Sequence, residues 1–315
     1  WLPRDACSYG YIILAPNFWD VRAQALWRAL QLPGGPVAVR IAQKKPGAPL
    51  SVRATRELDA ADCAALRAAV TRMLRLDEDE AHVARFHDLD PRWRASGRGR
   101  LFRSPSMFED VVKTVTSCNV AWPNTVRMNA RLCAVYGKPV LSPRSPEFLR
   151  VPAQARYTFP APATLTRARA PSLRARCRVG YRDQRIIDLA RLFAHGRVAP
   201  AWFEDPATPD DAVHQALIDL PGIGPYAAAN IMQLLGRYGR LPVDTESVRH
   251  GRAVLGMKGA SAAIMKRLHR HYAPMGDQAF RSYWFELWEW YERKRGPSHL
   301  WDADEVGSSF TAAQF

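Results

Sequence analysis

The chain has 315 residues, of which 47% are hydrophobic and 24% are charged, a composition that excludes a disordered chain and a membrane protein. Its 45 lysines and arginines outnumber 30 acidic residues, and the net charge of +15 indicates a polyanionic partner, most often nucleic acid, with a generally basic surface as the alternative. The five cysteines form no CxxC pair and no zinc-type spacing with histidine, which predicts free thiols in a reducing compartment.

The first hundred residues are expected to form an antiparallel sheet with flanking helices. Short apolar or alternating runs separated by Pro and Gly, SYGYIILA (8–15), GPVAVRIAQ (35–43) and APLSVRAT (48–55), are typical of strands. The segment between the first two, DVRAQALWRALQL (20–32), is interpreted as a short helix. A longer helix is predicted over 58–76, where Asp59 is a plausible N-cap.

From residue 101 the pattern becomes almost entirely helical. Ser106 and Glu109 have the spacing of a capping box, and Pro123 opens a second helix that ends near Gly137. Residues 138–165 are interpreted as a Pro-rich loop.

Three more amphipathic helices are predicted after that loop, over 180–196, 208–220 and 280–294. The second should begin with Thr208 as N-cap and Pro209 at the first helical position. The third carries a wide Trp and Tyr stripe, which more often faces a core than a ligand.

The string LPGIGPY (220–226) joins two of these helices as a hairpin. Gly222 and Gly224 allow a sharp turn and a close approach of a partner to the backbone. The N–H groups at the start of the second helix, as far as Ala227, then form an anion site that suits a DNA phosphate without reading sequence. A hairpin that only packs is the alternative, and the net charge favours DNA.

Together with Pro242-Val243-Asp244 further along, this hairpin resembles the helix-hairpin-helix DNA glycosylases, the superfamily of 8-oxoguanine, 3-methyladenine and endonuclease III-type enzymes. The resemblance extends over roughly residues 9–295 and implies an α+β fold: an N-terminal antiparallel sheet domain (1–100), a helical catalytic domain (101–296) and a tail (297–315). The strings CNVAWPNT and DTESVRH are most similar to a plant and bacterial branch.

The resemblance implies that Asp244 is catalytic. A fixed carboxylate would stabilise positive charge on the sugar while the N-glycosidic bond breaks, and it could activate the attacking water. An ordinary N-cap for the helix that begins TESVRH is the alternative. Bifunctional members carry a lysine where this chain has Tyr226, so a monofunctional enzyme is expected. A lyase that uses another lysine, and a non-catalytic DNA-binding module, are the rival interpretations.

Binding residues also follow from the resemblance. Tyr226, Asn230, Trp284 and Trp288 are candidates for the pocket of the flipped base, against the alternatives of a core tyrosine and a solvent-facing asparagine. Candidate DNA contacts besides the hairpin are Asn119 and Val120, Trp122 as a wedge or as core, and Arg182. Arg182 belongs to residues 167–185, which hold seven arginines and one acid, Asp183.

No cofactor is expected to be required, although relatives imply one Na⁺ or K⁺ bound by the backbone carbonyls of Leu220 and Ile223. The four-cysteine iron–sulfur motif is absent from the C-terminal region, so no cluster is expected. The expected partner is double-stranded DNA containing a modified base, with a monomeric protein and no membrane. The N-terminus lacks a signal-peptide pattern, and the expected location is the bacterial cytoplasm or nucleoid, or a eukaryotic nucleus or organelle. Alkylated purine, oxidised base and modified pyrimidine all remain open as the lesion.

Overall fold

The computed structural model describes residues 1–302, and the chain packs as two compact units. Unit 1 contains Trp1–Asp77, Leu101–Ala199 and, of the described residues, 299–302, and unit 2 contains Glu78–Arg100 and Pro200–Ser298. The domain boundary expected at residue 100 marks the change from strands to helices in the sequence. In the structure, the sheet packs in the same unit as the helices of residues 101–199. Of the expected tail at 297–315, residues 303–315 lie outside the described part.

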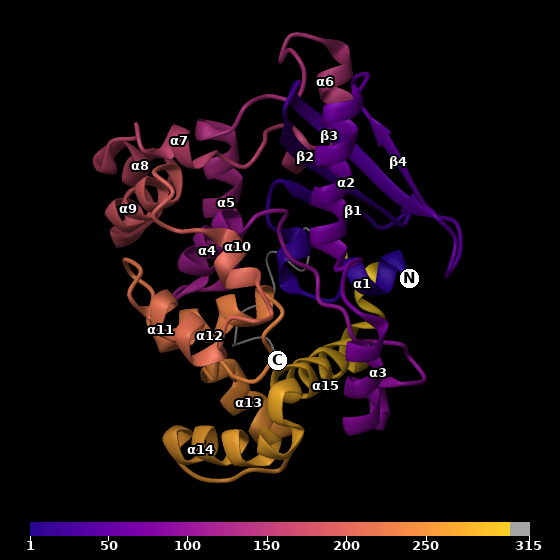
Figure 1. The fold of residues 1–315 in the computed structure, drawn as a ribbon, viewed down its shortest axis with the longest axis vertical. Helices are drawn as coiled ribbons and strands as arrows, with labels where there is room; N and C mark the ends of the chain where they lie inside the picture. The colour runs from indigo at the N-terminus through magenta and orange to yellow at the C-terminus, as the bar shows by residue number, and fades with distance from the viewer. Residues whose placement is uncertain (303–315) are drawn as a thin grey trace. The chain divides into compact units, whose positions relative to one another are not determined.

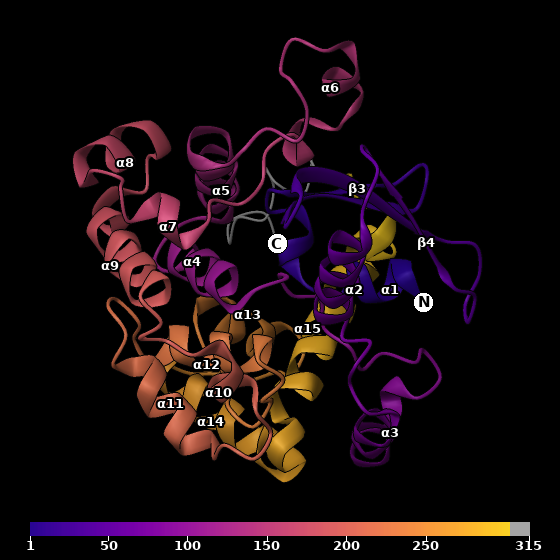
Figure 2. The ribbon, with the colours of Figure 1, turned by 45° about the horizontal axis from the view of Figure 1, so that its top comes forward.

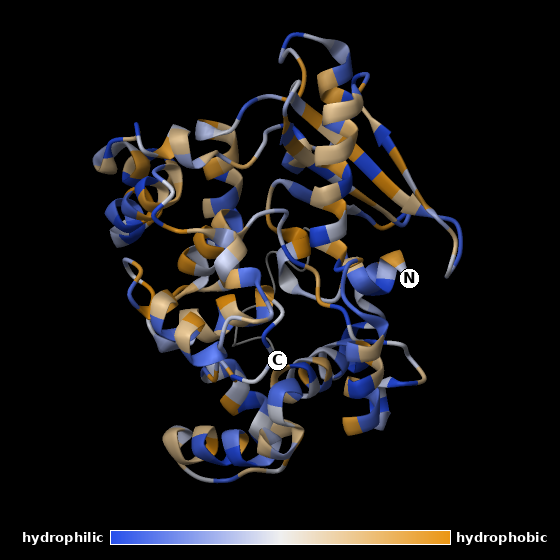
Figure 3. Cartoon of the chain, viewed as in Figure 1, coloured by the Kyte–Doolittle hydropathy of each residue, from blue (hydrophilic) through white to orange (hydrophobic). Residues whose placement is uncertain are grey.

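Unit 1 is built around a four-stranded antiparallel sheet with the order β1-β2-β3-β4 (Figure 1). Its strands are β1 (Asn17–Asp20), β2 (Ala25–Leu32), β3 (Gly35–Gln43) and β4 (Leu50–Ala54). In the register, Leu32 pairs with Gly35 across a two-residue turn and Ala29 pairs with Ala38. Hydrophobic and hydrophilic residues alternate along the edge strand β4 (Figure 3). The predicted antiparallel sheet is therefore confirmed.

Two N-terminal predictions are wrong. The helix expected over 20–32 is the end of β1, a turn and β2, because residues on both faces of β2 are buried and such a strand resembles a helix in its apolar content. The strand expected at 8–15 is a 3₁₀ helix, η1 (Gly10–Ile13). Its residue Tyr11 is buried, with its hydroxyl 2.8 Å from Thr114 Oγ1 and its carbonyl accepting from Asn17 Nδ2.

Helices complete unit 1, and α4 (Met107–Ser117), α5 (Trp122–Tyr136), α8 (Ala170–Cys177) and α9 (Asp183–Ala194) pack together beside the sheet (Figure 2). The chain enters through α1 (Leu2–Ala6), and α2 (Ala60–Leu74) packs on β2 with Asp59 as N-cap, as predicted. The remaining helices are α4 (Met107–Ser117), α5 (Trp122–Tyr136), α6 (Pro146–Arg150), η3 (Ala153–Ala155), α7 (Pro162–Leu165), α8 (Ala170–Cys177), η4 (Gly180–Arg182) and α9 (Asp183–Ala194). The predicted start of α5 at Pro123 and its end before Gly137 are confirmed.

The capping box expected at α4 forms only in part. Ser106 Oγ accepts from the Glu109 N–H, but the Glu109 carboxylate lies 2.5 Å from Arg28 Nη2 and 2.7 Å from Lys113 Nζ. All three charged side chains are buried. Burial opposes the charged form of Glu109, yet Arg28 and Lys113 together lower its pKa. This ion cluster ties α4 to β2.

The Pro-rich stretch 138–165 is more ordered than a loop, since it contains α6, η3 and α7. Val140, Val151 and Ala155 from this stretch pack with Ala29 and Ala38 of the sheet. A few apolar side chains therefore hold the segment on the sheet, although its sequence shows no helical periodicity.

Unit 2 is helical. Its elements are α3 (Glu80–Leu89), η2 (Pro91–Trp93), α10 (Pro200–Glu204), α11 (Asp210–Ile218), α12 (Pro225–Leu234), α13 (Thr245–Ala253), α14 (Ser261–Tyr272), η5 (Ala273–Gln278) and α15 (Ala279–Arg295), and a last turn, η6, spans Ser298–Leu300. The predicted cap of α11 is wrong, because Pro209 is its N-cap and the Thr208 hydroxyl donates to the Trp202 carbonyl. In the described part of the chain, none of the helices has the length and apolar character needed to cross a membrane.

Candidate functional site

The hairpin of unit 2 connects α11 to α12, which pack side by side (Figure 1). Gly222 has a φ of 77°, a left-handed conformation that favours glycine. Gly224 is the exposed N-cap of α12, and no heavy atom lies within 4 Å of where its Cβ would be. The absent side chain therefore leaves the start of α12 open to a partner. Within the turn, the Ile223 N–H donates to the Leu220 carbonyl at 3.1 Å.

Asp244 is the N-cap of α13, and its two carboxylate oxygens have different surroundings. Oδ1 accepts from the N–H groups of Glu246 (3.0 Å) and Ser247 (2.9 Å) and from Ser247 Oγ (3.1 Å). Oδ2 accepts from the Tyr226 hydroxyl at 3.0 Å. One oxygen thus fixes the carboxylate to the helix while the other faces the hairpin helix, so capping and a chemical role are compatible.

Tyr226 lies in the first turn of α12, and its side chain stays 36% exposed although its hydroxyl reaches Asp244. Asn230, one turn later, donates from Nδ2 to the Tyr226 carbonyl at 3.1 Å, so its amide is partly engaged within the helix. The hairpin and the P-V-D segment, 18 residues apart, therefore meet at the Tyr226 hydroxyl.

Sequence reasoning missed two residues that support Asp244. The hydroxyls of Ser247 and Tyr283 lie 2.7 Å apart, and both side chains are buried. The chain Tyr283–Ser247–Asp244 connects α15 to the carboxylate. The Asp-x-x-Ser spacing is a capping-box signal that could have identified Ser247, whereas Tyr283 is one member of a stripe that indicates core.

The tryptophans expected in the base pocket stack along α15. The Trp284 ring lies between Phe280, at a centroid distance of 5.7 Å, and Trp288, at 5.4 Å. Trp288 is buried and Trp284 is only half-buried. The stack supports the core interpretation of this stripe, and contact of either ring with a base stays a prediction.

The turn between α4 and α5 in unit 1 holds the residues expected to enter DNA. Asn119 is exposed and has a left-handed φ of 51°. The Trp122 ring packs on Gly10, where an added Cβ would lie 3.1 Å from Trp122 Cζ2. The Trp122 side chain is half-buried, so the core and the wedge interpretations both stay open. Val120 is half-buried beside the turn.

Arg182 is buried, and its guanidinium donates to backbone carbonyls at the end of α4. Nε donates to Val115 at 3.0 Å, and Nη2 donates to Cys118 and Asn119. Since the last carbonyls of a helix lack partners within it, Arg182 satisfies them and shapes the turn. These bonds engage the Arg182 guanidinium within the protein, and its direct contact with DNA stays a prediction.

Tyr181, next to Arg182, is an exposed aromatic that the sequence reasoning did not select. Its side chain is 51% exposed, and the guanidinium carbons of Arg182 and Arg185 lie 4.5 Å and 5.0 Å from its ring centroid. An aromatic residue between glycine and arginine in an arginine-rich run is the signal that could have identified it.

Among residues 1–302, no group of three or more His, Cys, Asp or Glu side chains is arranged to hold a metal ion. The carbonyls of Leu220 and Ile223 lie in the hairpin turn. Their binding of a monovalent cation stays a prediction.

No known family model and no curated protein matches this sequence. Solved structures match its fold: a 3-methyladenine DNA glycosylase from Archaeoglobus fulgidus has a TM-score of 0.68 and 16% identity, over 92% of this chain and 95% of that chain. The 8-oxoguanine glycosylase/lyase of Clostridium acetobutylicum in its apo form has a TM-score of 0.59 and 16% identity, over 89% of this chain and 93% of that chain. Its complex with double-stranded DNA containing cytosine opposite 8-oxoguanine has a TM-score of 0.58, with coverages of 91% and 93%. The predicted α+β fold is thereby confirmed, and these solved DNA glycosylases share it.

Proposed function

We propose that this chain is a monofunctional DNA glycosylase, which turns a modified base out of duplex DNA and hydrolyses its N-glycosidic bond. The observation that carries the proposal is that the two carboxylate oxygens of Asp244 have different partners. Oδ1 is held by the start of α13, and Oδ2 is directed to Tyr226 of the hairpin helix. The shared fold with solved DNA glycosylases supports the proposal.

In this mechanism Asp244 acts on charge that develops in the reaction. As the base leaves, positive charge grows on the deoxyribose, and a carboxylate that is already oriented stabilises it without reorganisation. The three donors on Oδ1 keep that oxygen in place, so Oδ2 is the oxygen that faces sugar and water. Oδ2 can also accept the proton of the attacking water.

Tyr226 has two roles in the proposal. Its hydroxyl donates to Oδ2, and in the proposal substrate sugar or water takes that position when DNA binds. Its exposed ring then offers a stacking surface to the flipped base, with Asn230 one turn away to contact a base edge.

A phenol cannot form a Schiff base, so Tyr226 gives no route to strand cleavage. Lys113, a potential alternative amine, is fully buried against Glu109, which removes it as a nucleophile. Lys258 is exposed and is one of the lysines through which the rival lyase mechanism would act.

DNA is held, in this proposal, by the open start of α12 on a phosphate and by the α4–α5 turn. Asn119 fills the gap left by the base, and Tyr181 replaces Trp122 as the wedge, because its ring is exposed whereas Trp122 packs on Gly10. The protein acts as a monomer, requires no cofactor, and binds at most a Na⁺ or K⁺ at the hairpin carbonyls.

The test is incubation with a panel of duplexes that each contain one alkylated purine, oxidised base or modified pyrimidine. Release of free base from at least one duplex, with strand breaks only after alkali, is expected. If the protein binds every duplex but releases no base, the non-catalytic DNA-binding interpretation replaces the enzyme.

A further inference from the structure

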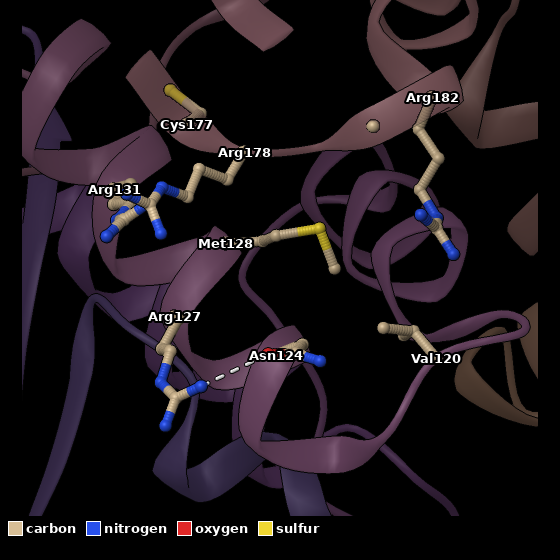
Figure 4. A pocket seen from close by; sticks show the side chains of 9 residues that line it. Val120, Asn124, Arg127, Met128, Arg131, Cys177, Arg178 and Arg182 are labelled. Carbon is tan, nitrogen blue, oxygen red and sulfur yellow. Dashed lines mark hydrogen bonds between the residues drawn. The ribbon is translucent and has the colours of Figure 1, made fainter. Parts of the chain in front are cut away.

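A pocket of about 300 Å³ in unit 1 is lined by four arginines and, among the described residues, by no acidic side chain. It lies between α5 and the turn that follows α8. Figure 4 shows Arg127, Arg131 and Arg178 on one side of the pocket and Arg182 on the other. The pocket borders the α4–α5 turn of the proposed function through Val120 and Arg182, whereas Arg127, Arg131 and Arg178 have no part in that proposal.

The guanidiniums differ in how far they are engaged. Arg182 donates to carbonyls, and Arg127 donates to Asn124 Oδ1 at 3.2 Å. The guanidiniums of Arg131 and Arg178 have no hydrogen-bond or ion-pair partner in the described part of the chain. Two arginines beside a pocket without acids can therefore bind an anion directly, while the other two add positive charge.

The backbone at Arg178 is the end of α8. Arg178 is the left-handed C-cap of that helix, with a φ of 56°, and its N–H donates to the Arg174 carbonyl at 3.0 Å. Because this N–H is engaged, an anion in the pocket meets the Arg178 side chain and not its backbone.

The pocket is larger than a phosphate ion requires. Val120 and Met128 give it an apolar part next to the arginines. Volumes near 300 Å³ accommodate small organic ligands. The charge, volume and lining of the pocket together suit a phosphate group with an apolar group attached.

We propose that this pocket binds a phosphate-bearing nucleotide through Arg131 and Arg178. The nucleotide is either free in solution or a unit of a DNA strand. The recognising chemistry is the same in both cases: guanidinium hydrogen bonds to phosphate oxygens and apolar contact with the base.

The test compares Arg131→Gln/Arg178→Asn with a matched control, Arg167→Gln/Arg169→Gln, which removes two exposed arginines of the same cluster outside the pocket. Asparagine at position 178 tolerates the left-handed backbone, so the pocket variant should fold. Arg131→Lys/Arg178→Lys is a second variant that preserves charge and removes the planar fork. Calorimetry with deoxyadenosine 5′-monophosphate, with deoxyadenosine as the phosphate-free probe, measures the free ligand. Anisotropy with a short undamaged duplex measures the strand.

We expect the pocket variant to lose at least about tenfold in affinity, the lysine variant about threefold, and the control less than about twofold. Loss for the monophosphate identifies a free nucleotide as the ligand, and selective loss for the duplex alone identifies a strand. If the pocket variant equals the control in both measurements, or if deoxyadenosine binds as tightly as the monophosphate, the proposal is wrong. Neither measurement depends on base release, so this proposal and the proposed enzyme activity fail separately.

Discussion

Replacing Asp244 by asparagine separates the two roles of this side chain. Asparagine keeps an oxygen that can accept from the N–H groups of Glu246 and Ser247, and it is as good an N-cap as aspartate. The substitution removes the negative charge from the position now bonded to Tyr226. We therefore expect Asp244→Asn to fold normally and to lose base release.

The expected magnitudes follow from these contacts. Asp244→Asn should change the free energy of unfolding by less than about 0.5 kcal/mol, whereas Asp244→Ala loses the cap and about 1 kcal/mol. Loss of a preorganised charge that acts on the transition state costs about 3–4 kcal/mol, which corresponds to a decrease of about 10²–10³ in the rate of base release. Duplex affinity should stay within about threefold, because the carboxylate acts on developing charge and not on phosphate.

The assay is single-turnover base release on a duplex that the substrate panel has identified, with urea unfolding and duplex binding measured in parallel. Asp79→Asn is the matched control, since Asp79 is the N-cap of α3 in the same unit and accepts from the Ala81 N–H. Base release by Asp244→Asn at the wild-type rate, or an equal loss in Asp79→Asn, would refute the catalytic assignment.

Borohydride should trap no covalent complex with DNA, because Tyr226 supplies no amine; efficient trapping that Lys258→Ala abolishes would instead establish the lyase interpretation. Duplex affinity should fall steeply between low and physiological salt, as expected for a protein with a net charge of +15 that displaces counterions from several phosphates, and a flat response would exclude a DNA-binding face of this kind. Burial alone would raise the pKa of Glu286, but the His250 ring 3.2 Å away and hydrogen bonds from Tyr272 and Arg92 lower it to about 2 from its usual 4.5. Because the folded pKa is depressed, Glu286 stabilises unit 2 above pH 4.5 by about 3 kcal/mol, and this contribution is lost as the pH falls toward 2. Urea unfolding from pH 6 to pH 2 should show a smaller loss of stability in Glu286→Gln than in wild type, with Glu289→Gln, which is partly exposed on the same helix, behaving as wild type.

Elements with local signals were predictable. Asp59 caps α2, Pro123 lies at the start of α5, and the glycines of the hairpin mark its turn, because in each case the physical cause lies within a few residues. The fold class followed from these elements together with the P-V-D segment.

Predictions failed where the physical cause of a structure lies far along the chain. Residues 20–32 have the apolar content of a helix, and burial of both faces of β2 makes them a strand. The Glu109 carboxylate does not complete the capping box of α4, because it bonds to Arg28 of the sheet, 81 residues earlier in the chain. For Trp122 the sequence leaves core and wedge both open, and the packing of its half-buried ring on the distant Gly10 has no signal in the local pattern.

The sequence by itself therefore determined the hairpin, the position of Asp244 and the basic character, since these depend on residue type and short spacing. Only the tertiary structure decided that Oδ1 of Asp244 is bound to α13 while Oδ2 meets Tyr226, and that Arg182 supports the turn bearing Asn119. The same is true of Arg131 and Arg178, which come to line one pocket. The physical reason is that each arrangement depends on the directions of side chains from separate helices. Tertiary packing sets these directions, and the conformational preferences of neighbouring residues do not.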